Sequence, residues 1–154
     1  MSVKSESKPV PSSRAAVSLA FTAVFFLLAC SLAVAMGSKP SDVDYSTTRL
    51  SDKGVYKVTF FSLSDPLPLN KIHSWRLHVE KADGGPLEEA AIQVAGGMPQ
   101  HGHGLPTQPQ VTENLGGGDY LVEGMKFQMP GWWVVRLSIS SGGTTDQVTF
   151  NLQL

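Results

Sequence analysis

The chain has a single cysteine, Cys30, in 154 residues. An intrachain disulfide is therefore excluded, and so are a CxxC redox motif and a zinc site built on paired thiolates. Charged residues make up only 16% of the sequence and are nearly balanced, with 12 Lys and Arg against 13 Asp and Glu. Such a chain lacks the positive field that holds a phosphate backbone, so we predict that it binds no nucleic acid.

The sequence also lacks the common catalytic motifs. It has no Gly-x-Ser-x-Gly elbow, no His-Glu-x-x-His pair and no Gly-x-x-x-x-Gly-Lys-Ser/Thr loop. No local spacing provides the three ligands and the oriented carboxylate of a metal hydrolase. The adjacent carboxylates Glu88 and Glu89 follow a turn and are expected at a solvated edge. We therefore predict that the protein is not an enzyme.

A long uncharged run lies near the N-terminus. Residues 1–14 carry three cationic side chains against one acidic side chain, and residues 15–36 carry no charge. A helix of that length extends about 33 Å, enough to cross a hydrocarbon core of about 30 Å. The cationic flank predicts that residues 1–14 stay in the cytoplasm and that everything after residue 36 lies outside it. Residues 37–49 are polar and are expected to form a tether to a domain at residues 50–154.

Three fates of residues 15–36 stay open. The segment could be retained as a signal anchor, because its apolar run exceeds the roughly 7 to 15 residues of a signal-peptide core. It could be cleaved after Ala35, where Ala33-Val34-Ala35 fits a small-x-small cleavage site. It could also be lipidated at Cys30, which follows Leu-Leu-Ala. All three fates place the remaining chain on the outer side of a membrane.

The sequence after residue 50 alternates apolar and polar residues with the period of a strand. The alternating segments are Tyr56–Phe60, Trp75–Val79, Ile92–Val94, Tyr120–Val122, Trp133–Ile139 and Val148–Leu154. Glycine-rich turns separate them, and no helical period persists over three turns. Six or seven short strands, each apolar on one face, predict an all-β, immunoglobulin-like antiparallel β-sandwich after the N-terminal transmembrane or signal helix.

Residues 96–111 do not fit this pattern. They show no strand alternation, and loops of this length inside a compact domain are usually functional. Three prolines lower the entropy of the free segment, so we expect a loop with a defined shape. The loop contains Met98, His101 and His103, and all four histidines of the chain lie between residues 73 and 103.

A mixture of imidazole and thioether without thiolate suits copper in an oxidising, exported compartment. In an extended His-x-His segment both rings project to one side. We therefore predict that Met98, His101 and His103 bind copper, with His73 as a fourth candidate ligand. Met125 and Met129 share a face with a phenylalanine and are expected to pack in the core instead.

The alternative stays open that the histidines are structural. His101 and His103 could bond to backbone carbonyls and hold the shape of the loop. His73 shares the face of Trp75 and could be a satisfied core histidine. In that case the loop would form a metal-free contact with a protein or a small ligand.

Three stretches resemble the YtkA-like domain family: residues 70–75 (NKIHSW), 96–107 (GGMPQHGHGLPT) and 124–133 (GMKFQMPGWW). FixH-type proteins of cytochrome oxidase assembly are more distant relatives. The resemblance covers about residues 51–154, and Met-Pro-x-His-Gly-His-Gly-Leu-Pro-Thr is its most specific part. It implies an extracytoplasmic immunoglobulin-like sandwich, often behind one membrane helix, in a bacterium.

The resemblance also implies a role near respiratory copper enzymes or in cation handling. We therefore expect a non-catalytic accessory domain, anchored to the inner membrane of a bacterial cell envelope and facing the periplasm. A respiratory oxidase or a copper-handling protein is the expected partner.

Overall fold

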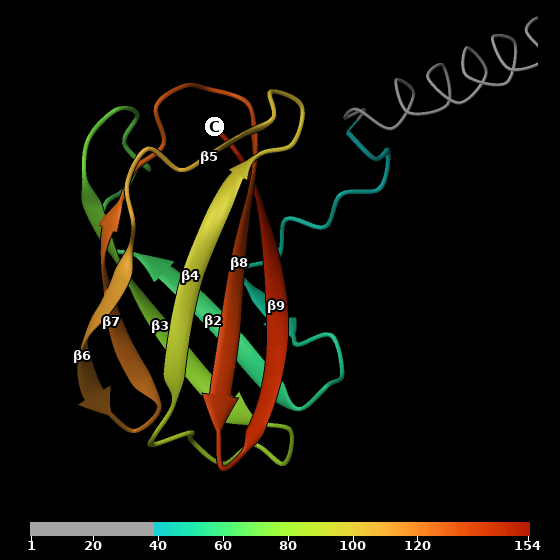
Figure 1. The fold of residues 1–154 in the computed structure, drawn as a ribbon, viewed down its shortest axis with the longest axis vertical. Helices are drawn as coiled ribbons and strands as arrows, with labels where there is room; N and C mark the ends of the chain where they lie inside the picture. The colour runs from blue at the N-terminus through green and yellow to red at the C-terminus, as the bar shows by residue number, and fades with distance from the viewer. Residues whose placement is uncertain (1–38) are drawn as a thin grey trace, which may run out of the picture. The chain divides into compact units, whose positions relative to one another are not determined.

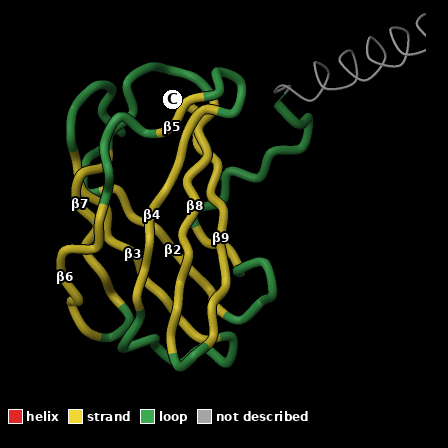
Figure 2. Tube along the Cα trace, in the orientation of Figure 1, coloured by secondary structure: helices red, strands yellow, loops and turns green. Residues whose placement is uncertain are grey.

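The structure is a computed structural model that describes residues 39–154, and these residues form β-strands joined by turns (Figures 1 and 2). The strands are β1 (Thr48–Leu50), β2 (Tyr56–Ser62), β3 (His73–Lys81), β4 (Ala91–Met98), β5 (His103–Gly104), β6 (Gln110–Gly116), β7 (Asp119–Met125), β8 (Trp132–Ser141) and β9 (Thr144–Gln153). The prediction of an all-β chain is confirmed for this region. The segments 1–14 and 15–36, with Cys30 and Ala35, lie outside the described residues. Residues 39–154 include no helix with the length and apolar character needed to span a membrane.

The strands pair antiparallel in the order β1-β2-β3-β7-β6-β4-β8-β9, with the short β5 paired to β4. The ladder between β4 and β6 consists of one residue pair, Gln93 opposite Gln110. The two strands at the ends of this order, β1 and β9, also lie against each other. The strands thus form one hydrogen-bonded path that curves around the core and nearly closes on itself (Figure 1).

The predicted alternation sets which side chains fill the core. Inward positions of β3, β8 and β9 are fully buried, whereas Arg136 of β8 is exposed. Phe60 of β2 stacks on Trp75 of β3 with ring centroids 4.4 Å apart. Phe60 also meets Phe150 of β9 edge-on at 5.0 Å. Aromatic rings therefore join the two sides of the curved sheet without a disulfide.

The prediction of one loop over residues 96–111 is wrong. Strand β4 continues to Met98, β5 occupies His103–Gly104, and β6 begins at Gln110. The end of β4 cannot be recognised from the sequence, because Gly96 and Gly97 contribute no side chain to an alternating pattern. Strand β6 is mostly exposed, and two register shifts in its pairing with β7 break its alternation. Strand β1 was likewise not predicted, because it is short and mostly exposed.

Within the segment predicted as a tether, residues 39–49 contact the strands of the domain. The Lys39 Nζ donates to Gln153 Oε1 at 3.0 Å, and the Asn151 amide donates to the carbonyl oxygen of Asp44 at 3.0 Å. Strand β1 begins at Thr48, two residues before the expected start of the domain. Part of the polar segment therefore lies along β9 because its backbone and side chains find hydrogen-bond partners there.

A buried carboxylate ties the β1–β2 turn to β9. Asp146 is 3% exposed and accepts hydrogen bonds from the backbone N–H groups of Lys53 at 3.0 Å and Gln147 at 2.8 Å. Burial acts to raise the pKa of Asp146, but hydrogen bonds from Ser51 and from these backbone groups outweigh it and hold the pKa below its ordinary value.

We expect Asp146→Asn to lower the free energy of unfolding by about 1–3 kcal/mol at neutral pH, because an amide cannot accept all of these hydrogen bonds. The depressed pKa means that the carboxylate stabilises the fold above its unfolded-state pKa of about 3.9. This stabilisation is lost as the pH falls through the lower folded-state pKa. Urea unfolding between pH 7 and pH 2 measures both effects, with the exposed Asp52→Asn as control. Equal stability of Asp146→Asn and the wild type would contradict this role.

Candidate metal centre

The hairpin between β4 and β5 carries three of the four predicted ligands. Strand β4 ends at Met98, and the N–H groups of His101 and Gly102 both donate to the Met98 carbonyl oxygen at 3.0 Å. Gly102 has a φ of +67°, which the tight turn requires and which glycine adopts without strain. The chain then returns so that His103 pairs directly with Met98.

Two glycines let this hairpin pack closely on β8. A Cβ at Gly96 would lie 2.7 Å from the carbonyl oxygen of Val134. A Cβ at Gly97 would collide with the carbonyl oxygen of His103. Gly97 therefore allows β5 to approach β4 closely, and Gly96 allows β4 to approach β8.

The rings of His101 and His103 lie together at the tip of the hairpin. Their centroids are 5.8 Å apart, with an interplanar angle of 28°. A metal–nitrogen distance of about 2.0 Å places a ring centre about 3.2 Å from the ion, so two imidazoles on one ion have centres about 4.5–6.4 Å apart. The observed separation lies within this range. His101 is exposed and His103 is half-buried, so both rings are open to solvent on one side.

The surroundings of His103 define which ring nitrogen is free. Its Nδ1 lies 3.2 Å from the Gly104 carbonyl oxygen, which can only accept, so Nδ1 carries the proton. The Gln128 amide nitrogen also lies 3.2 Å from this Nδ1, while Gln128 Oε1 is buried without a partner among the described residues. When the amide nitrogen and oxygen of Gln128 are exchanged, Oε1 accepts a hydrogen bond from the Nδ1–H of His103. The Nε2 lone pair of His103 is then available to a metal.

Met98 lies beneath the histidines rather than beside them. It is 1% exposed, and its Cε lies 2.6 Å from the position of a Cβ on Gly131. Directly paired residues of an antiparallel ladder point to the same face, so the thioether and the His103 ring share one side of the hairpin. The buried indole of Trp133 meets His103 edge-on, with centroids 5.8 Å apart.

His73 does not join this group. Within residues 39–154, no three side chains of His, Cys, Asp or Glu are arranged to hold one ion. His73 begins β3, is 6% exposed and lies in the core, where its ring centroid is 5.6 Å from that of Phe127. Its Nδ1 lies 3.2 Å from the Lys71 carbonyl oxygen. The position therefore matches that of a core histidine on the face of Trp75.

The remaining histidine belongs to a different cluster on the sheet. His78 Nδ1 lies 2.7 Å from Asp119 Oδ1, and Arg76 Nη1 lies 2.7 Å from Asp119 Oδ2. Burial acts to raise the pKa of Asp119, but the hydrogen bonds from His78 and Arg76 outweigh it, so the pKa is lowered. His78 is thus engaged with a carboxylate.

Sequence reasoning missed two neighbours of the hairpin, Gln128 and Arg136. Gln128 contacts His103, and Arg136 lines a hollow of about 320 Å³ with Met98 and His103. Met129 was expected in the core but is 36% exposed, so that expectation is wrong. Its carbonyl oxygen accepts a hydrogen bond from Trp133 Nε1 at 3.0 Å. These residues come from β8 and the β7–β8 loop, and no spacing in the sequence connects either segment to the hairpin.

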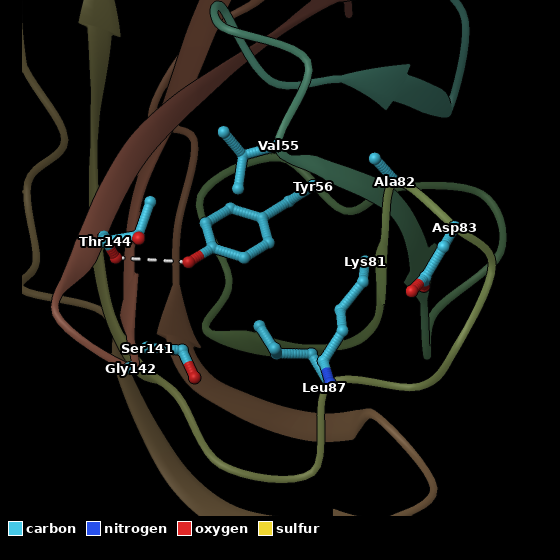
Figure 3. A pocket seen from close by; sticks show the side chains of 9 residues that line it. All are labelled: Val55, Tyr56, Lys81, Ala82, Asp83, Leu87, Ser141, Gly142 and Thr144. Carbon is cyan, nitrogen blue, oxygen red and sulfur yellow. Dashed lines mark hydrogen bonds between the residues drawn. The ribbon is translucent and has the colours of Figure 1, made fainter.

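A second hollow of about 490 Å³ lies at the other end of the sheet, beside the β8–β9 turn (Figure 3). Tyr56 crosses it and donates a hydrogen bond from its hydroxyl group to the Thr144 carbonyl oxygen at 3.1 Å. The described residues that line it include neither histidine nor methionine. It is therefore unlike the hairpin and offers no ligands for a soft metal ion.

Residues 56–138 match the sequence model of the family described as YtkA-like. The chain belongs to the YtkA-like family. The match includes the hairpin, all four histidines and both methionines of β4 and β7. The predicted membership of the YtkA-like family is thereby confirmed.

The YtkA-like chain is also similar to one solved structure, described as "ZirS C-terminal Domain". The identity is 14%, the TM-score is 0.37, and the alignment covers 100% of this chain and 88% of the other. No curated protein matches the chain.

The close packing of the hairpin predicts that alanine substitutions at two glycines of this YtkA-like domain change the free energy of unfolding by different amounts. Gly97→Ala should cost about 1–3 kcal/mol of unfolding free energy, because its methyl group would push β5 away from β4. Gly104→Ala is the matched control, since its nearest neighbour would lie at 3.4 Å. Thermal unfolding and NMR contacts between His103 and Trp133 measure the effect. The claim fails if both variants are equally stable and keep these contacts.

Proposed function

We propose that this YtkA-like chain is an exported, membrane-anchored, non-catalytic accessory domain that binds copper through Met98, His101 and His103. The observation that carries the proposal is the pair of imidazoles at the hairpin tip, whose 5.8 Å separation suits one shared ion. The hydrogen bond from His103 Nδ1 to a backbone carbonyl supports it, because such bonds orient metal-binding histidines.

The donor set favours copper over harder ions. Imidazole binds Cu, Zn, Ni and Fe, whereas a thioether selects Cu(I). The buried Met98 lies on the side of the hairpin that His103 faces, so a copper ion held by the imidazoles would have sulfur on its inner side. Met129, exposed beside Trp133, supplies a second thioether at the same end of the domain.

We assign the protein to the bacterial cell envelope, anchored in the inner membrane with the domain facing the periplasm. The cationic residues 1–14 followed by the uncharged residues 15–36 support this placement. The domain would present its copper to a respiratory oxidase or to a copper-handling protein. The family resemblance supports such a partner, and a donor set of imidazole and thioether without thiolate suits copper in an oxidising compartment.

We also propose that the domain is an immunoglobulin-like sandwich. The single residue pair between β4 and β6 divides the curved sheet into β1-β2-β3-β7-β6 and β4-β8-β9. Each part buries one apolar face against the other, and the Phe60–Phe150 contact crosses between them.

One observation favours the alternative, a metal-free interaction module. The Arg136 side chain lines the same hollow as Met98 and His103, and its positive charge opposes a bound cation. In that case His103 would only hold the hairpin to Trp133 and Gln128, and the hollow would take an anionic group of a protein or a small ligand.

A Cu(II) titration of the full chain distinguishes these functions. We expect one equivalent to bind with imidazole nitrogen couplings in the electron paramagnetic resonance spectrum, and His101→Ala with His103→Ala to abolish it. His78→Ala is the control, because that ring faces Asp119 instead. All samples carry Cys30→Ala, which removes the only thiol. Wild-type binding no stronger than that of the double variant would exclude the copper site.

The orienting role of Gln128 gives a second prediction. Gln128→Leu should weaken Cu(II) binding about 10–100-fold, as expected for loss of a residue that orients a ligand. The exposed Gln100→Leu, in the same hairpin, is the matched control and should leave the affinity unchanged. An unchanged affinity in Gln128→Leu would show that the His103 ring is oriented without this amide.

A further inference from the structure

His73 has a buried nitrogen that the hairpin site does not use. Its Nδ1 donates to the Lys71 carbonyl oxygen, so Nε2 carries the lone pair. The residue is 6% exposed, and Nε2 has no hydrogen-bond partner among the described residues. A buried polar atom without a partner costs about 1–3 kcal/mol, so a bound water or a ligand at Nε2 would stabilise the fold.

A bulge in β7 places a thioether opposite this nitrogen. Trp75 pairs with Val122, but His73 pairs with Met125, so two steps along β3 correspond to three along β7. Side chains alternate between the faces of a strand, and without the extra residue Met125 would point away from the core. The bulge reverses this parity, so Val122 and Met125 both point inward.

The bulge is held in place by specific contacts. Gly124 has a φ of +84°, a conformation that glycine adopts without strain. The Thr107 hydroxyl donates to the Gly124 carbonyl oxygen at 2.6 Å, which ties the bulge to the segment before β6. Met125 is fully buried, and paired residues on one face of an antiparallel ladder have Cβ atoms about 4.5–5.5 Å apart. The thioether and the imidazole are therefore neighbours in the core.

The environment of this pair suits a soft ion of low charge. Phe127 lies against His73, and Trp75 follows on the same inward face of β3. Residues 39–154 provide no third His, Cys, Asp or Glu ligand there, as a divalent ion would need. A neutral imidazole and a thioether instead match the preference of Cu(I).

We propose that His73 Nε2 and Met125 Sδ form a second, buried position for a soft monovalent cation of the Cu(I) type. This position lies apart from the hairpin, because Trp133 contacts both His103 and Phe127, and Phe127 in turn contacts His73. The inference goes beyond the proposed function and does not require that His101 and His103 bind copper.

Silver(I) is a suitable probe because it resembles Cu(I) and does not change oxidation state under these conditions. The test uses the full chain in detergent, with Cys30→Ala to remove the thiol and His101→Ala with His103→Ala to remove the hairpin imidazoles. We expect one equivalent of Ag(I) to remain bound. The ¹⁵N resonance of His73 Nε2 and the ¹³C resonance of the Met125 methyl group should both shift on binding.

A volume-conserving core substitution outside both candidate sites provides the matched control. In this background Met125→Leu should abolish the remaining equivalent, whereas Ile139→Leu, at a fully buried position of β8, should retain it. Both substitutions conserve side-chain volume and should cost less than about 1.5 kcal/mol of stability, which thermal unfolding verifies. His73→Gln should also abolish binding.

Three results would overturn the proposal: no Ag(I) bound in the background variant, binding that persists in Met125→Leu, or binding lost in Ile139→Leu. An unshifted His73 Nε2 resonance in the loaded protein would do the same, because a bound water would then satisfy the nitrogen. Failure of the hairpin site has a different signature, since the wild type would bind no Cu(II) while the Ag(I) results stayed as expected.

Discussion

The packing of aromatic rings around Phe127 is the constraint on which both candidate metal positions depend. Its ring lies 5.2 Å from Trp133, 6.1 Å from Trp75 and 5.6 Å from His73, measured between centroids. Trp133 in turn supports the ring of His103. One buried cluster therefore supports the half-buried imidazole of His103 and the buried imidazole of His73. Because cores are close-packed, the His73 ring cannot shift without displacing these neighbours.

Much of the fold could be predicted from the sequence, because burial of one face per strand imposes a period of two. Strands β3, β8 and β9 follow this rule, and their apolar positions form the core. The rule fails where a strand has no inward side chain to offer, as at Gly96 and Gly97. It also fails at the β7 bulge, where parity reverses, and in β6, where most residues are exposed.

The candidate site was predicted in part from the sequence, and physical reasons explain why the rest could not be predicted. The His-x-His spacing placed His101 and His103 together because both lie in one short hairpin. No local pattern could show that Met98 points into the core or that His73 lies beyond Trp133 and Phe127. Gln128 and Arg136 reach the hairpin from other strands and loops, and such contacts depend on the packing of the whole domain.

X-ray absorption at the copper edge of the loaded full chain, with Cys30→Ala, shows whether the hairpin imidazoles and a thioether bind copper. We expect nitrogen neighbours at about 2.0 Å with the outer-shell scattering of two imidazoles, and a sulfur neighbour at about 2.3 Å in the reduced protein. A spectrum with only water-like oxygen neighbours and no imidazole scattering would contradict this expectation.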